Sequence, residues 1–182
     1  MKNRIKIILL LFGILSFNCS HPKKIQLPTI NDSTVANATY YMPYMEGVCD
    51  TIKLTSGFWE KVITDSEYVE REYIRLYKVA YGDLNNNNKT DAAVVLAQCT
   101  GGSGVFISIN ALIDSSGMPF HRACKYIGDR IKVDSIFVKD QIIHLNAIVQ
   151  RYNVGACCPD SLVSWKFRLD GNKLDEITGA TF

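Results

Sequence analysis

The segment from Asp91 to Gln98, with the sequence DAAVVLAQ, decides the fold of this chain. It is a nearly continuous apolar run of strand length, and a strand of that composition is typically covered on both faces. The glycine-rich segment Thr100 to Gly104 (TGGSG) follows as a turn and leads into a second apolar run, Val105 to Ile113. We therefore expect DAAVVLAQ to be a buried strand that hairpin turns connect to its neighbours.

Short segments rich in Val, Ile, Tyr and Phe continue on both sides of this strand, separated by Gly, Asn, Asp and Ser. The expected strands are 51–54, 58–63, 73–81, 91–98, 105–113, 120–127, 131–138, 141–152 and 162–169. Thr55-Ser56-Gly57 predicts a hairpin between the first two, and Lys139-Asp140 predicts one between 131–138 and 141–152. The fold class is mainly β, with a β-rich α+β fold as the alternative: an antiparallel sheet of successive hairpins, curled or stacked. One short helix over Asp65 to Glu72 stays open.

The first 18 residues are typical of an export signal. A basic start is followed by an apolar run of 13 residues, from Ile5 to Phe17, whereas a helix that spans a bilayer needs roughly 20. The segment Leu15 to Cys19 (LSFNC) resembles the lipobox of bacterial lipoprotein precursors. The resemblance implies that residues 1–18 are a lipoprotein signal peptide, that Cys19 is acylated, and that the membrane is a partner through that lipid.

Composition then divides the chain into three parts. Residues 19–38 are polar and contain Pro22 and Pro28, so they are expected to be the lipidated N-terminus and a flexible tether, with a single β-rich domain over 39–182. The formal charge of +2 comes from the signal: without Lys2, Arg4 and Lys6, 17 basic residues remain against 18 acidic ones. A net charge near −1 gives no support to nucleic-acid binding. We expect a bacterial cell-envelope protein, held by lipid at the outer membrane or the periplasmic face.

Six cysteines occur in the sequence, at Cys19, Cys49, Cys99, Cys124, Cys157 and Cys158. With Cys19 lipidated, the other five are disulfide candidates, and their odd number leaves a thiol or an intermolecular bond. Export makes disulfides plausible, but five cysteines do not define a pairing. The adjacent Cys157 and Cys158 leave three interpretations open: a structural bridge or turn, a redox pair, or a soft-metal site. No C-x-x-C motif is present.

The loop from 83 to 91 (DLNNNNKTD) has the spacing of a calcium loop. Oxygen-bearing side chains stand at positions 1, 3, 5 and 9, which are Asp83, Asn85, Asn87 and Asp91, and the Lys89 carbonyl stands at position 7. Position 12, a glutamate in EF-hands, is a valine. With two carboxylates, Ca²⁺ would bind weakly, at about 10⁻⁴–10⁻³ M or poorer. The alternative is a polar turn whose side chains bond backbone N–H groups.

These motifs together resemble a family of small exported bacterial proteins with the patterns GDLNGDGxxDAAVxL, TGGSG, GDR and CCP. The likeness runs from about Asn37 to Ile177, and the calcium loop itself is similar to those of FG-GAP-like repeats. It implies a β-rich fold and export, and it implies no particular activity. Asn87 stands where that family has Asp, and Asn88 where it has a Gly in the left-handed conformation, which asparagine tolerates better than most residues.

No arrangement of residues predicts catalysis. TGGSG lacks the helix and the Lys-Ser/Thr of a phosphate loop, and His121 and His144 are expected to be surface or hydrogen-bonded residues. In Gly128-Asp129-Arg130, Arg130 is expected to reach a carboxylate or carbonyl. The sequence thus predicts a non-enzymatic binding or structural module, stabilised by weak Ca²⁺, with an unknown protein or envelope partner. The alternative is a redox-active or enzymatic envelope protein that uses Cys157 or Cys158.

Overall fold

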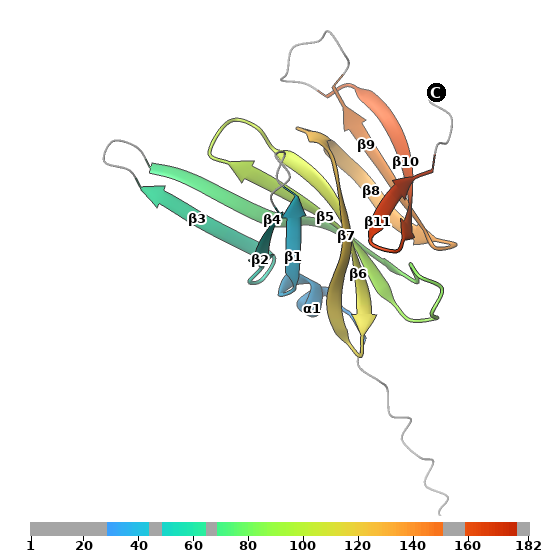
Figure 1. The fold of residues 1–182 in the computed structure, drawn as a ribbon. Helices are drawn as coiled ribbons and strands as arrows, with labels where there is room; N and C mark the ends of the chain where they lie inside the picture. Colours follow the sequence, from blue (N-terminus) through green and yellow to red (C-terminus); the bar gives the residue numbers. More distant parts are fainter. Residues whose placement is uncertain (1–28, 44–48, 65–68, 151–158, 178–182) are drawn as a thin grey trace, which may run out of the picture.

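The structure is a computed structural model of the 182-residue chain and describes residues 29–43, 49–64, 69–150 and 159–177. Within these ranges the chain forms one short helix and eleven strands (Figure 1). The helix is α1 (Asp32–Ala36), and the strands are β1 (Thr39–Pro43), β2 (Cys49–Lys53), β3 (Phe58–Thr64), β4 (Val69–Gly82), β5 (Asp91–Thr100), β6 (Phe106–Ser115), β7 (Met118–Asp129), β8 (Lys132–Lys139), β9 (Ile142–Val149), β10 (Ser161–Asp170) and β11 (Lys173–Glu176). The expected mainly β class is confirmed.

The strands form three antiparallel sheets. The largest has the order β3-β4-β5-β6-β7, the second has the order β11-β10-β9-β8, and β1 and β2 form a separate hairpin. All neighbouring strands in these sheets are consecutive along the chain, as successive hairpins require. Of the two expected arrangements, stacked sheets are the one observed, and no sheet is curled or closed within the described ranges.

Strand β5 is the centre of the largest sheet and is buried at every position from Asp91 to Cys99, which confirms that DAAVVLAQ is covered on both faces. Its side chains alternate between two cores because successive strand residues point to opposite faces. Ala93, Val95 and Ala97 face the β8–β11 sheet, and the intervening residues face the β1–β2 hairpin and α1. Each fully buried valine or leucine contributes about 1.5–3 kcal/mol, so β5 stabilises both interfaces.

The β8–β9 pairing is confirmed, with its turn one residue later than expected. Asp140 and Gln141 connect the strands with φ angles of 51° and 62°. Positive φ at both central residues defines the type I′ turn, whose twist matches that of an antiparallel pair. Lys139, expected in the turn, instead pairs with Ile142 at the end of the strands.

The turn predicted at Thr55-Ser56-Gly57 exists, but the strands beside it do not form a hairpin. Ser56 and Gly57 have φ angles of 52° and 81°, and one isolated bridge joins Thr55 to Phe58. Strand β2 pairs with β1, and β3 pairs with β4. Gly57 donates its N–H to the Ala36 carbonyl at 2.7 Å and accepts from the Leu76 N–H at 2.7 Å. The turn is therefore held between two layers, and the chain passes through it from one layer to the other.

Two other expectations need correction. The tether expected to reach residue 38 ends sooner: α1 is part of the domain, and Ile30, Val35 and Ala38 are buried in the core beneath the β1–β2 hairpin. The short helix left open at 65–72 is wrong from Val69 onward, where β4 begins, and 65–68 lie outside the described residues. The signal peptide, Cys19 and the rest of the tether also lie outside them. No helix in the described ranges has the length and apolar character needed to cross a membrane.

Candidate functional site

The asparagine-rich loop between β4 and β5 is organised by the carboxylate of Asp83. Its oxygens accept the backbone N–H groups of Asn85 at 3.1 Å, Asn87 at 3.1 Å and Asn88 at 2.7 Å. The Asn87 side chain in turn accepts the Lys89 N–H at 2.8 Å. Burial is the largest single influence on the pKa of Asp83 and raises it, but the backbone N–H donors of the loop together outweigh burial and hold the pKa below its usual range. Asp83 is therefore a stable anion around which the loop folds.

Asp91 closes the loop from inside the protein. It is fully buried, and its two oxygens accept the N–H of Leu84 at 3.0 Å and the N–H of Asp114 at 2.9 Å. Burial raises the pKa of Asp91, and these two bonds lower it by less. The side chain thus joins the loop to β6. Asn88, where the similar family has a glycine, adopts the expected left-handed conformation with a φ of 59°. Asn86 is also left-handed, with a φ of 62°.

The predicted calcium ligands use most of their side-chain oxygens within the protein. The side-chain oxygens of Asp83, Asn87 and Asp91 bond backbone N–H groups, as in the polar-turn alternative, while Asn85 points its side chain into a cavity beside the loop. Within the described residues, no three His, Cys, Asp or Glu residues are grouped to hold a metal. The oxygen atoms of this loop are of the kind that binds Ca²⁺. The weak calcium site, including the Lys89 carbonyl, stays a prediction.

The cysteines with described side chains are Cys99, which is buried on β5, and Cys124, which is half-buried on β7. Cys124 pairs with Asn110, which pairs with Val94, five residues along β5 from Cys99. Five strand residues span about 16 Å, so a bond between these two cysteines, which needs Cα atoms within about 7 Å, is excluded. The side chains of Cys49, Cys157 and Cys158 lie outside the description, and pairings with them stay predictions.

The Gly128-Asp129-Arg130 segment has the structural role expected of it. The Arg130 guanidinium donates to the Ser103 carbonyl and hydroxyl, both at 3.2 Å, and Asp129 accepts the Val105 N–H at 2.8 Å. The segment therefore fixes the TGGSG connection between β5 and β6. The glycine-rich loop is held in place by these contacts.

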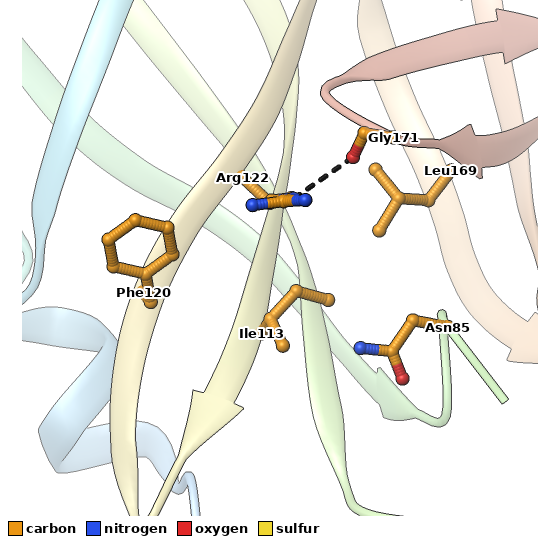
Figure 2. Close-up of a pocket in the computed structure, with 6 residues that line it drawn as sticks. All are labelled: Asn85, Ile113, Phe120, Arg122, Leu169 and Gly171. Carbon is orange, nitrogen blue, oxygen red and sulfur yellow. Dashed lines mark hydrogen bonds between the residues drawn. The ribbon is translucent and has the colours of Figure 1, made fainter. Parts of the chain in front are cut away.

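A groove along β7 is the feature that sequence reasoning missed. Two adjoining cavities of about 320 Å³ and about 500 Å³ share Phe120 and Arg122 among their lining residues. The smaller is also lined by Asn85, Ile113, Leu169 and Gly171 (Figure 2), and the larger also by Tyr41, His121, Cys124 and Asn172. We call the two cavities together the β7 groove. It lies at the edge of the largest sheet, because β7 is the last strand in that sheet's order.

A β-bulge places Arg122 in this groove. His121 pairs with Leu112 and Ala123 with Ala111, so Arg122 has no partner residue on β6. The bulge changes the phase of the strand: Ala123 lies in the core facing the β8–β11 sheet, while His121 faces the β1 tyrosines. Bulges at sheet edges commonly redirect a side chain. Here the Arg122 Nε donates to the Gly171 carbonyl at 3.0 Å, across the groove in the β10–β11 turn.

His121 forms the inner wall of the larger cavity and is hydrogen-bonded, as expected. Its Nε2 lies 3.0 Å from the Asn110 side-chain oxygen, which requires Nε2 to carry the proton, and the rings of Tyr40 and Tyr41 meet it edge-on. Burial lowers the pKa of His121 to about 4, so the imidazole is neutral at physiological pH. His144 lies elsewhere, stacked on Phe137 with ring centroids 4.5 Å apart.

No local sequence signal identifies the groove, because its walls come from β1, β6, β7, β10, the β10–β11 turn and the asparagine-rich loop. Comparison of the chain with known proteins found no matching family model, no matching curated protein and no matching solved structure.

Proposed function

We propose that this protein is a lipid-anchored module of the bacterial cell envelope that binds a partner in the β7 groove and catalyses no reaction. The observation that carries the proposal is the groove itself: a concave site that combines apolar side chains with one arginine whose terminal nitrogens have no partner among the described residues. Mostly apolar cavities with a few placed polar groups are typical of ligand sites.

The anchor limits how far the groove stands from the membrane. Ile30 is the first buried residue in the part of the chain that the structure describes, and it follows the proposed lipidation site Cys19 by 11 residues. An extended chain spans at most about 3.5 Å per residue, so the domain would lie within about 40 Å of the bilayer. Two or more acyl chains on Cys19 would make that attachment stable. A partner would therefore be met close to the membrane surface.

Weak Ca²⁺ binding by the asparagine-rich loop is part of the proposal. Asp83 supplies the exposed carboxylate, and Asn85 belongs both to the loop and to the wall of the β7 groove. An ion held there would restrict the loop and so stabilise one shape of the groove. The expected affinity is that of extracellular calcium sites with few charges, about 10⁻⁴–10⁻³ M.

Fractionation of cells tests the anchor. The variant Cys19→Ser should move the protein from the membrane fraction to the soluble fraction, with its circular dichroism and melting temperature unchanged. Lys24→Ala, a change in the same segment, serves as the control and should stay with the membrane. If Cys19→Ser protein remains in the membrane fraction, lipid anchoring through Cys19 is wrong.

A further inference from the structure

The smaller cavity of the β7 groove combines one cation, one amide and three apolar side chains from four parts of the chain (Figure 2). Arg122 lies opposite the β10–β11 turn, Asn85 borders the cavity from the asparagine-rich loop, and the apolar surface is formed by Ile113, Phe120 and Leu169. We propose that this cavity binds a carboxylate attached to an apolar body, with the carboxylate on Arg122. The proposal rests on the binding role of the β7 groove and names the chemistry of its ligand.

Arg122 is held in position yet keeps its binding atoms. Its Nε is bonded to the Gly171 carbonyl at 3.0 Å, which fixes the plane of the guanidinium. Throughout the described part of the chain, neither terminal nitrogen has a hydrogen bond, and Arg122 takes part in neither of the two ion pairs observed. Two parallel N–H groups in one plane match the two oxygens of a carboxylate. A side chain fixed before binding also loses less conformational entropy when the ligand arrives.

Three carboxylates, at the asparagine-rich loop, on β5 and on β6, are already bonded to the backbone. Asp83 accepts three loop N–H groups, Asp91 accepts two, and Asp114 accepts the Gly117 N–H. The carboxylate oxygens of these three residues are thus engaged with backbone N–H groups rather than with Arg122. An external carboxylate therefore has no internal acid to displace from Arg122 in the contacts that the structure describes.

Asn85 adds a second polar contact at the other end of the cavity. Its backbone N–H is bonded to Asp83, but its side-chain amide has no hydrogen bond to any described residue. The amide can donate to another acceptor of the ligand, such as a peptide carbonyl oxygen. Its neighbour Asn87 turns its side chain back to the loop instead. Asn85 lines the cavity, so its side-chain amide is available to a ligand bound there.

The size of the cavities favours a small aromatic or aliphatic acid. A volume of about 320 Å³ lies at the lower end of the range for small-ligand sites, roughly 300–1,000 Å³. The adjoining cavity of about 500 Å³ gives space for a chain leading away from the acid along β7. The same chemistry is therefore supplied by a free apolar acid or by the C-terminal residue of a peptide, and the experiment below separates these sources.

Calorimetry on the full-length protein in detergent, with blank titrations into detergent alone, provides the test. The probes are N-acetylphenylalanine and its uncharged amide, followed by a blocked tripeptide ending in phenylalanine as the free acid and as the amide. We expect each acid to bind at least about tenfold more tightly than its amide, since a charge-assisted bidentate contact is lost in the amide. A tripeptide acid tighter than the single amino acid identifies a peptide end as the ligand, and equal affinities identify a small acid.

Two arginine variants locate the effect. Arg122→Gln should abolish the preference for acids, whereas Arg168→Gln should keep it. Arg168 is exposed on β10 and points away from the cavity, because Leu169 beside it lines that cavity and strand residues alternate. The control removes the same charge from the same protein. Amide signals of residues 120–124 in two-dimensional NMR should shift with the acid in the wild type and in Arg168→Gln.

The outcomes separate the two proposals. Equal binding of acid and amide with shifts at 120–124 overturns the carboxylate inference but leaves the groove as a binding site. An acid preference that survives Arg122→Gln overturns the assignment to Arg122. No binding of any probe at 10 mM (about 3 kcal/mol at most) overturns both the inference and the role of the groove.

Discussion

Asp91 is the residue whose replacement best tests how the asparagine-rich loop is held. Its carboxylate is fully buried and accepts two backbone N–H groups, from Leu84 and Asp114. In Asp91→Asn the amide oxygen can accept one of these two N–H groups. The amide NH₂ then faces the other N–H group, and because both are donors no hydrogen bond can form there. The change keeps the shape of the side chain, so a loss of stability reports on the hydrogen bonds rather than on a cavity.

The size of the effect follows from those two bonds. A hydrogen bond to a charged group contributes about 1.5–3 kcal/mol, and leaving its buried N–H unsatisfied costs about 1–3 kcal/mol. The neutral amide also avoids the desolvation of the buried carboxylate, the effect that raises the pKa of Asp91. We therefore take the lower part of the range, about 2 kcal/mol. For a domain of this size that lowers the melting temperature by about 4–8 °C.

Urea unfolding at pH 7, followed by circular dichroism, measures this difference. The matched control is Asp83→Asn, an identical chemical change in the same loop, at an exposed carboxylate whose N–H partners water can reach. We expect the control to cost about 1 kcal/mol or less. The reasoning is refuted if Asp91→Asn costs under 0.5 kcal/mol, about the scatter of a neutral surface substitution, or if the control costs as much.

Three further predictions address other parts of the molecule. The pKa of His121 in the folded protein, about 4, lies below its unfolded value of 6.5, so lowering the pH from 6.5 to 4 should reduce the wild-type free energy of unfolding by up to about 3 kcal/mol. In His121→Gln this loss should be smaller. An equal dependence of stability on pH in the two proteins would contradict the prediction. Gly82→Ala should cost about 1–3 kcal/mol in urea because a Cβ there would lie 2.6 Å from Val138, and Val138→Ala should restore part of it; a neutral Gly82→Ala would show that this contact relaxes freely. With a dissociation constant of 1 mM, 10 mM CaCl₂ should add about 1.4 kcal/mol to wild-type stability and nothing to Asp83→Ala, and silence in both would favour the polar turn.

The sequence predicted those parts of the fold that depend on local pattern. DAAVVLAQ identified a strand buried on both faces, and the turns at 114–117 and at Lys139-Asp140 identified the hairpins β6–β7 and β8–β9. The Thr55-Ser56-Gly57 turn was found, but its layer change was not, because that depends on contacts with Ala36 and Leu76 from distant segments. The tether was predicted too long for a similar reason. Helix α1 has one buried residue, Val35, and the buried cluster around Val35 includes side chains from strands that are distant in the sequence.

The candidate site was harder to predict, because a bulge produces it. Period-two alternation assigns His121 and Ala123 to one face, whereas the extra residue Arg122 places them in different cores. Nothing in a single strand shows whether its partner has a matching residue; the β6 register has to be known first. The oxygen-bearing loop was recognised because its candidate ligands are close together in the sequence, while the β7 groove draws on segments that only the folded chain brings together.

Asp91 links the loop to the groove. Its carboxylate bonds Leu84, the residue before Asn85, and Asp114, the residue after Ile113, and both Asn85 and Ile113 line the smaller cavity. One buried side chain thus sets the distance between two walls of the proposed carboxylate site, and the same side chain is a predicted calcium ligand. The coupling free energy between two sites is the same whichever ligand binds first, so the factor by which Ca²⁺ changes the affinity for the acid must equal the factor by which the acid changes the affinity for Ca²⁺. Titrating each ligand in the presence of the other measures that coupling, and in Asp91→Asn it should vanish even where each ligand still binds.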